Sequence, residues 1–167
     1  MTRLIALRVG VVYISLMLAT GILFVNLYTS LVDAKSWSAN IPQSIQTERD
    51  YYRVVNPGHF FRAFAPVLQV MALVALAMNW KSSPQIRLYL GIALLSFVLV
   101  DVLTFAYFYP RNKIMLSADL ATELEVVRKA VAQWQAMNWV RTLIQLTGMS
   151  FSACALHRIY EKHQTVS

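Results

Sequence analysis

Four apolar stretches, separated by charged connections, make up roughly half of this 167-residue chain. A helix that crosses about 30 Å of hydrocarbon needs about 20 predominantly apolar residues. The first and third stretches reach this length alone. The second and fourth are completed by flanking arginines, whose apolar stems can lie in the membrane. The sequence therefore predicts an all-α integral membrane protein, a single four-helix domain over residues 1–167 with spans at about 9–32, 61–80, 88–110 and 139–160.

The low content of charged residues supports this location. Only 14% of the residues are charged and 57% are hydrophobic, against about 25% charged residues in an ordinary soluble domain. Most basic residues stand within a few positions of an apolar stretch, where Lys and Arg commonly meet lipid headgroups. No basic run is interleaved with aromatic residues, and the lone Cys154 excludes a disulfide framework and a CxxC redox pair. We therefore expect a lipid bilayer as the partner, and no nucleic acid.

The distribution of basic residues predicts the orientation. With four spans, the two termini and the connection between the second and third spans share one side of the membrane. Six Lys or Arg lie in the short segments of this side, whereas nine on the opposite side are spread over two loops of about thirty residues each. Since positive residues in short segments mark the cytoplasmic side, we expect both termini in the cytoplasm, in a plasma or inner membrane.

The two long connections differ in character. The first, residues 33–59, contains the turn signal Asn56-Pro57-Gly58 and is expected to be partly ordered, with room for a short helix. In the second, Ser117 can act as a helix N-cap with Asp119 in the first turn. Apolar side chains then recur at helical spacing, at Leu120, Leu124, Val127, Val131 and Trp134. This pattern predicts an amphipathic helix that leads into the fourth span.

Polar residues gather on one side of the membrane once the four helices alternate in direction. At the span ends on this side lie Asn26, Tyr28, His59, Arg62, Tyr107, Tyr109, Arg111, Asn112, Asn138, Arg141 and Gln145. Asp101 lies roughly two helical turns deeper than Tyr109, and Gln69 about two turns deeper than Arg62. These side chains could therefore line, in order of depth, a cavity that opens on that side.

Asp101 is the residue most in need of an explanation, because an isolated charge in lipid is costly. An intramembrane carboxylate is a functional-site candidate by default. The alternative is a structural role, in which Asp101 holds helices together by a hydrogen bond or an ion pair with Arg141, Arg62 or Gln69.

The histidines do not predict a metal site. His59 precedes the second span and His157 ends the fourth, so alternating helices place them on opposite sides of the membrane and they cannot ligate one haem. No HExxH motif and no Cys/His cluster occurs in the sequence. His59 could act as an acid or base at the cavity mouth, or be an ordinary interfacial histidine after a turn.

Short motifs over nearly the whole chain resemble the anthrone-oxygenase-like family of small four-span membrane proteins. They are residues 21–24, Asn56-Pro57, TFAYFYPRN at 104–112 and WQAMNWVRT at 134–142. The last two correspond to the family patterns Pro-x-Asn and Trp-x-x-x-Asn-x-x-Arg, which carry over to Pro110, Asn112, Trp134, Asn138 and Arg141. The first loop departs from the family, because it has no clear counterpart of the family's Pro-rich segment.

The resemblance implies oxidation of a tricyclic anthrone to a quinone by dioxygen, with no cofactor, although much of the family has no assigned activity. Such chemistry needs a base, groups that stabilise an anion, and an apolar pocket. On this reading Asp101 or His59 is the base, and Arg141 with Asn112 and Asn138 stabilises the anion. The substrate-binding residues are then Trp134, Tyr107, Tyr109, Gln69 and Gln145.

The other hypothesis is a non-catalytic membrane module, either a partner subunit or a protein that binds a lipophilic small molecule. Asn112 and Asn138 would then cross-link helix ends, and Arg141 would anchor at the headgroups. The two hypotheses predict different structures. An enzyme requires a continuous cavity that reaches Asp101 from the side of Arg141, whereas a structural module would have Asp101 and Arg141 locked together without a cavity.

Overall fold

The computed structural model describes residues 3–164, and in this range the chain is helical apart from short turns. The helices are α1 (Arg3–Tyr28), α2 (Ala34–Ser38), α3 (Gln43–Tyr51), α4 (Pro57–Met78), α5 (Pro84–Leu103), α6 (Tyr109–Ser117) and α7 (Leu124–Gln164). Two π-helical turns, η1 (Thr29–Asp33) and η2 (Thr104–Phe108), join α1 to α2 and α5 to α6. The predicted all-α fold is confirmed.

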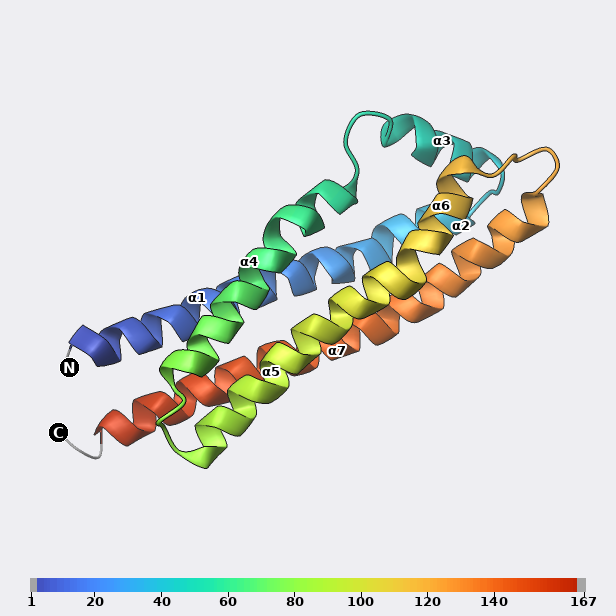
Figure 1. Cartoon of the computed structure of the whole chain (residues 1–167). Coiled ribbons are helices and arrows are strands. Elements are labelled where there is room, and N and C mark those ends of the chain that lie inside the picture. Colours follow the sequence, from blue (N-terminus) through green and yellow to red (C-terminus); the bar gives the residue numbers. More distant parts are fainter. Residues whose placement is uncertain (1–2, 165–167) are drawn as a thin grey trace.

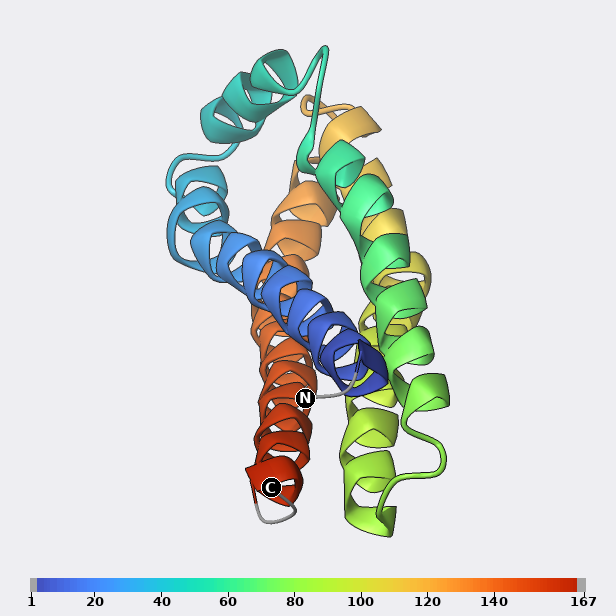
Figure 2. The same cartoon turned by 90° about the vertical axis from the view of Figure 1, so that its left-hand side faces the viewer.

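Four long helical segments form an elongated bundle, capped at one end by short helices (Figure 1). α1 begins and α7 ends at the same end of the bundle as the turn between α4 and α5 (Figure 1). α3 lies across the opposite end, which we call the capped end, close to α2 and α6 (Figure 2). α7 is one continuous helix of 41 residues, so the predicted amphipathic helix and the predicted fourth span belong to a single element.

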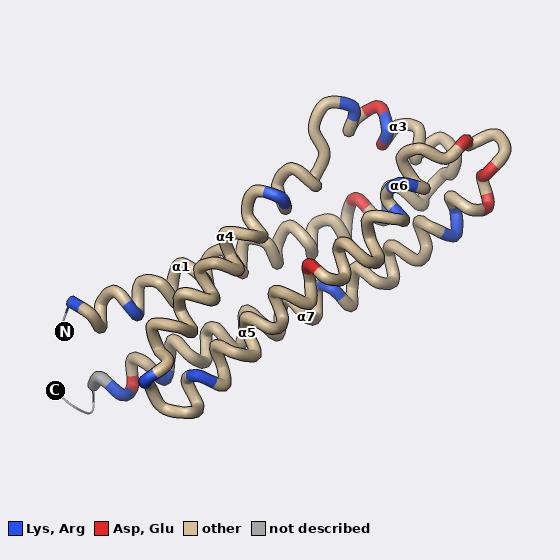
Figure 3. The backbone as a smooth tube through the Cα atoms, in the orientation of Figure 1, with Lys and Arg blue, Asp and Glu red and all other residues tan. Residues whose placement is uncertain are grey.

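Three helical segments are long and apolar enough to cross a membrane: Arg3–Ser38, Pro57–Met78 and Pro84–Ser117. Only 17% of the most apolar part of α4 is buried inside the protein, so its apolar side chains face outward and need a nonaqueous surrounding. Charged residues gather toward the two ends, and the middle of the bundle is almost free of them (Figure 3). The chain is therefore an integral multi-pass membrane protein.

α7 is less hydrophobic because its inner face is polar. Asn138, Arg141, Thr142, Gln145 and Ser152 are all buried against the other helices. These side chains lower the mean hydropathy of α7, although the helix packs along α1 and α5 through the bundle. Its crossing of the membrane stays a prediction.

The prediction of a helix start at Ser117 is wrong. The helix that contains Asp101 runs on through Pro110, and Ser117 is the last residue of α6. Pro110 is tolerated because it follows η2, where the wider π-turn leaves the helical hydrogen bonding locally altered and a missing N–H costs little. Asp119 instead accepts hydrogen bonds from the Ala121 amide and the Thr122 hydroxyl in the turn that precedes α7.

The capped end has its own hydrophobic core, distinct from two further clusters along the bundle. It comprises Ala34, Trp37, Ile45, Phe108, Met115, Val127, Ala130, Val131 and Trp134. Arg49 fastens α3 to this end, donating from Nε to the Met115 carbonyl and from Nη2 to the Ala118 carbonyl, each at 2.8 Å. These oxygens lie at the C-terminus of α6, where a positive charge is favoured. The first long connection is thus an ordered cap.

Candidate functional site

Two adjoining cavities occupy the half of the bundle nearest the capped end. The inner cavity, of about 110 Å³, lies between α1, α4, α5 and α7. The outer cavity, of about 510 Å³, lies beneath α3 and α6. The residues that line both are Phe61, Arg62, Thr104, Tyr109 and Arg141. Because they share these residues, the cavities adjoin, and they lie one behind the other from the capped end toward Asp101.

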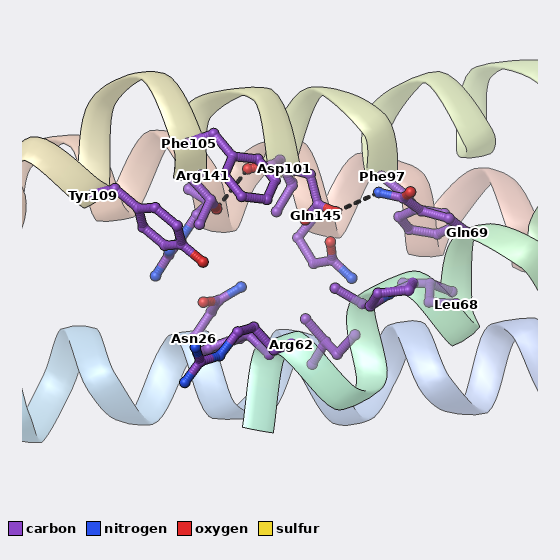
Figure 4. Close-up of a pocket in the computed structure, with 16 residues that line it drawn as sticks. Asn26, Arg62, Leu68, Gln69, Phe97, Asp101, Phe105, Tyr109, Arg141 and Gln145 are labelled. Atoms are coloured by element: carbon purple, nitrogen blue, oxygen red, sulfur yellow. Dashed lines mark hydrogen bonds between the residues drawn. The ribbon is translucent and has the colours of Figure 1, made fainter. Parts of the chain in front are cut away.

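Asp101, on α5, lines the inner cavity with Gln69 from α4 (Figure 4). The Gln69 amide donates a hydrogen bond of 2.6 Å to Asp101 Oδ2. Gln145, on α7, lines the same cavity and donates from Nε2 to the Ala19 carbonyl at 3.2 Å. Of the three partners that the sequence offers to Asp101, Gln69 is the one that bonds to it.

Arg141 stands between the two cavities and is only 5% exposed. Its Nη2 donates to Asn138 Oδ1, and Asn138 Nδ2 in turn donates to Ser30 Oγ at 2.6 Å. Asn138 lines neither cavity. It lies behind Arg141 and ties α7 to the end of the first helical segment, so it holds the guanidinium in place.

Aromatic rings surround the Arg141 guanidinium. The centroid of the Phe108 ring lies 4.2 Å from Arg141 Cζ, and the Phe61 and Trp134 rings lie at 5.6 Å. Ring faces attract a cation, and the attraction grows when water is excluded. These rings therefore help to keep a charged guanidinium in a buried position.

Asp101 and Arg141 line the inner cavity together, yet they form no salt bridge within the described structure. Asp101 can also be approached from outside. An open groove between α4 and α5 is lined by Gln69, Val98, Asp101, Val102, Phe105 and Ala106. Gln69, Asp101 and Phe105 therefore separate the inner cavity from the outer surface of the bundle.

The outer cavity combines aromatic walls with polar groups from the cap. Trp134 packs edge-on against Trp37, with ring centroids 4.9 Å apart, and its Nε1 donates to Asn112 Oδ1 at 2.8 Å. Trp134 and Asn112 both line this cavity, together with Glu48 and Tyr52. Burial raises the pKa of Glu48, an effect that the Trp37 and Tyr52 side chains partly offset, and burial also raises the pKa of Tyr52.

Besides Asn138, two of the predicted site residues line neither cavity. His59 is exposed, lines neither cavity, and takes part in a capping box at the start of α4, where its Nδ1 accepts from the Asn56 amide at 3.3 Å. Tyr107 also lines neither cavity. Its ring lies 3.4 Å from Arg111 Cζ, on the side of η2 that faces Gln133. Tyr109, by contrast, lines both cavities.

Some cavity residues were absent from the predicted site. Asn26 lines the inner cavity, and Glu48, Tyr52 and Lys113 line the outer one. The sequence did indicate Asn26 as a candidate, because it is an amide within an apolar stretch. The positions of the other three depend on how the cap folds back over the bundle, which the local sequence does not encode.

The described residues contain no group of three or more His, Cys, Asp or Glu side chains that could hold a metal ion. The site offers a carboxylate, a buried guanidinium, amides and aromatic walls around two adjoining cavities.

Residues 52–151 match the family model described as anthrone oxygenase. This segment includes α4, α5, α6 and the first part of α7, and so covers Asp101, Arg141 and most of both cavity walls. No curated protein and no solved structure matches the chain.

Proposed function

Because the chain belongs to the anthrone oxygenase family, we propose that it oxidises a lipophilic aromatic with dioxygen, without a cofactor, in the two adjoining cavities that Asp101 and Arg141 line. The observation that carries this proposal is the arrangement of these two groups. Opposite charges in a bundle interior would ordinarily neutralise each other in an ion pair. Here both line one cavity and make no such pair, which leaves them available to a ligand.

The reaction proposed is that of an anthrone with one molecule of dioxygen. A base takes a proton from the ring CH₂, and the resulting anion is delocalised onto the ketone oxygen. The CH₂ carbon then loses four electrons to dioxygen and becomes a second carbonyl. One oxygen atom enters that carbonyl and the other leaves as water, so the products are a quinone and water.

Asp101 is the base in this proposal, because it lines the inner cavity and His59 lines neither. Arg141 stabilises the anion, held from behind by Asn138. Trp134, oriented by its bond to Asn112, and Tyr109 provide the walls, while Gln69 and Gln145 complete the polar lining. A buried donor that is held in place before the reaction stabilises developing charge without reorganisation.

We further propose that α7 is a fourth span, that both termini are cytoplasmic, and that the protein resides in a plasma or inner membrane. The packing of α7 along the other long helices and the basic residues of the short segments support this arrangement. A lipophilic substrate would then be taken from the bilayer, which the groove lined by Asp101 between α4 and α5 would face.

A second candidate function is that of a non-catalytic protein that binds a lipophilic molecule. The hydrogen bond between Gln69 and Asp101 favours it, since that bond also serves to join α4 to α5. The two candidates differ in whether the bound molecule is changed.

The test is to incubate purified protein with anthrone under oxygen and to follow formation of anthraquinone. We expect wild type to exceed the spontaneous rate, and Asp101→Asn to lower the enzymatic rate by about 100-fold or more, because general bases contribute about 10²–10⁴-fold. Arg141→Ala should have a loss of the same order. Matched controls are Asp119→Asn in the exposed turn before α7 and Arg111→Ala, which lies outside both cavities. Equal turnover by all variants, or no turnover above the spontaneous rate, would contradict the proposal.

A further inference from the structure

Asn26, on α1, is the most unusual polar residue in the inner cavity. The residue has 0% of its surface exposed and lines this cavity, yet neither Oδ1 nor Nδ2 of its side chain has a hydrogen-bond partner. A buried amide without partners has lost its hydrogen bonds to water and gained none in the protein, which destabilises the folded state. Most buried polar side chains are paired for this reason.

The side chain points into the cavity. Figure 4 shows the Asn26 amide extending from α1 into the space that Tyr109 and Gln145 face from the opposite side. Arg141 lines the same space, and its buried Nε also has no hydrogen-bond partner. The Asn26 side-chain oxygen, its amino group and the Arg141 Nε–H are therefore unused hydrogen-bonding groups around one small cavity.

Two other buried asparagines do have hydrogen-bond partners. Asn138, equally buried, has partners for both ends of its amide, and Asn79 donates to the Ala75 carbonyl within its own helix. Arg8 Nε and Glu48 Oε1 are also buried without a partner, but among the described residues that line the inner cavity only Asn26 and Arg141 carry such atoms. Asn26 also lies outside the segment that matches the family, so membership of the family assigns it no role.

The sizes of the two cavities limit what can reach Asn26. Sites for small molecules usually enclose about 300–1,000 Å³. The outer cavity, at about 510 Å³, has this size, and the inner one, at about 110 Å³, accepts only the edge of such a molecule. A ligand in the outer cavity would extend one ring edge past Arg141 toward Asn26.

We infer that Asn26 is a specificity-determining residue that, with Arg141, recognises a ring edge bearing an oxygen anion beside a hydroxyl group. The anion would accept from Arg141 Nε–H and Asn26 Nδ2–H, and the hydroxyl would donate to Asn26 Oδ1. This inference rests on the proposed function for the location of the ligand, but it concerns binding and needs no turnover.

The experiment compares the affinities of two flat tricyclic probes for purified protein in detergent, by quenching of tryptophan fluorescence. 1,2-Dihydroxyanthraquinone carries adjacent oxygens on one ring edge, and 9,10-anthraquinone lacks them. We expect wild type to bind the hydroxylated probe more tightly than anthraquinone. Asn26→Leu should lower the affinity for the hydroxylated probe by about tenfold and leave the affinity for anthraquinone unchanged. Asn26→Ala, which is smaller, serves if the leucine does not fit.

The thermal unfolding midpoint of the empty protein is the second readout. Because the amide has no partner, Asn26→Leu should leave the midpoint unchanged or raise it. The matched control, Asn79→Leu, removes a buried amide that is bonded within its helix, so it should lower the midpoint and leave the ratio of probe affinities unchanged.

The inference is overturned if both Asn26 variants weaken the two probes equally or not at all, or if they lower the midpoint without changing the affinity ratio. A changed ratio in a protein that does not oxidise anthrone would support the role of Asn26 and count against the proposed oxidation alone.

Discussion

Asn138 shows how one buried amide can organise a site without touching its cavity. Its carbonyl oxygen accepts from Arg141, and its amino group donates to Ser30 Oγ and toward the Asn26 carbonyl. The side chain is satisfied on both ends and joins α7 to the first helical segment. Its contribution to function is therefore to fix the position of the guanidinium.

Replacing Asn138 by Leu should lower the free energy of unfolding by about 2–4 kcal/mol, because it leaves the buried Arg141 guanidinium without its acceptor and removes the bond to Ser30 Oγ. Chemical denaturation in mild detergent measures this change. Thr147→Ala is the control, since Thr147 is exposed and bonds only to the Leu143 carbonyl of its own helix. Similar unfolding of the two variants would mean that the bonds of Asn138 add little.

Glu48 should make stability depend on pH. Its pKa in the folded protein is raised by burial above the ordinary value of 4.5, so the folded state favours the protonated form. The stability that Glu48 contributes through this preference is fully present below the ordinary pKa and is lost as the pH rises through the raised value. As the pH rises above the ordinary value of 4.5 and through the raised pKa, the unfolding midpoint of wild type should fall relative to that of Glu48→Gln. Parallel curves for the two proteins would contradict this.

At the scale of elements, α5 and α7 approach closely at Gly148. A Cβ added there would lie 2.5 Å from the Phe97 ring and 3.0 Å from Ser96 Cβ. Small residues allow helices to come together in this way where no hydrophobic effect drives them. The contact matters for the site because Phe97 also lines the inner cavity.

Gly148→Ala should therefore destabilise the protein by about 1–3 kcal/mol, since the Phe97 ring must shift to admit the new methyl group. Gly91→Ala on α5 is a matched control, because nothing lies within 4 Å of an added Cβ there. The control should be neutral or slightly stabilising, as alanine favours helix more than glycine does. The difference in unfolding free energy between the two variants is the measurement, and a value near zero would contradict the close contact.

At the scale of the whole molecule, the positions of three turns and of the end of α7 on the two sides of the membrane can be tested with single cysteines in a Cys154→Ala background. We expect an impermeant maleimide added to intact cells to label Asn40→Cys and Thr122→Cys, at the capped end. Ser82→Cys and Tyr160→Cys, at the opposite end, should be labelled only after the membrane is opened. Labelling of Thr122→Cys and Tyr160→Cys from the same side would show that α7 does not cross.

Much of this architecture follows from the sequence alone. Length and hydropathy determined the helical segments, because each apolar stretch must satisfy its backbone within itself in lipid. The helical alternation of direction also brought Asp101, Gln69, Tyr109, Arg141 and Gln145 to one cavity as expected. Helix ends were less predictable, since the continuation through Pro110 depends on a π-turn that no local pattern announces.

Only the tertiary structure decided which polar groups meet. A side chain's partner depends on the rotation of each helix about its axis and on the path of the cap, and both are set by packing over the whole bundle. In the packed bundle, Gln69 bonds to Asp101 and Asn138 lies behind Arg141. His59 lies at an exposed helix start, and the Asn26 amide in the inner cavity has no hydrogen-bond partner. The sequence by itself determined where the chain resides and which segments are helical, and the fold determined where a ligand can bind.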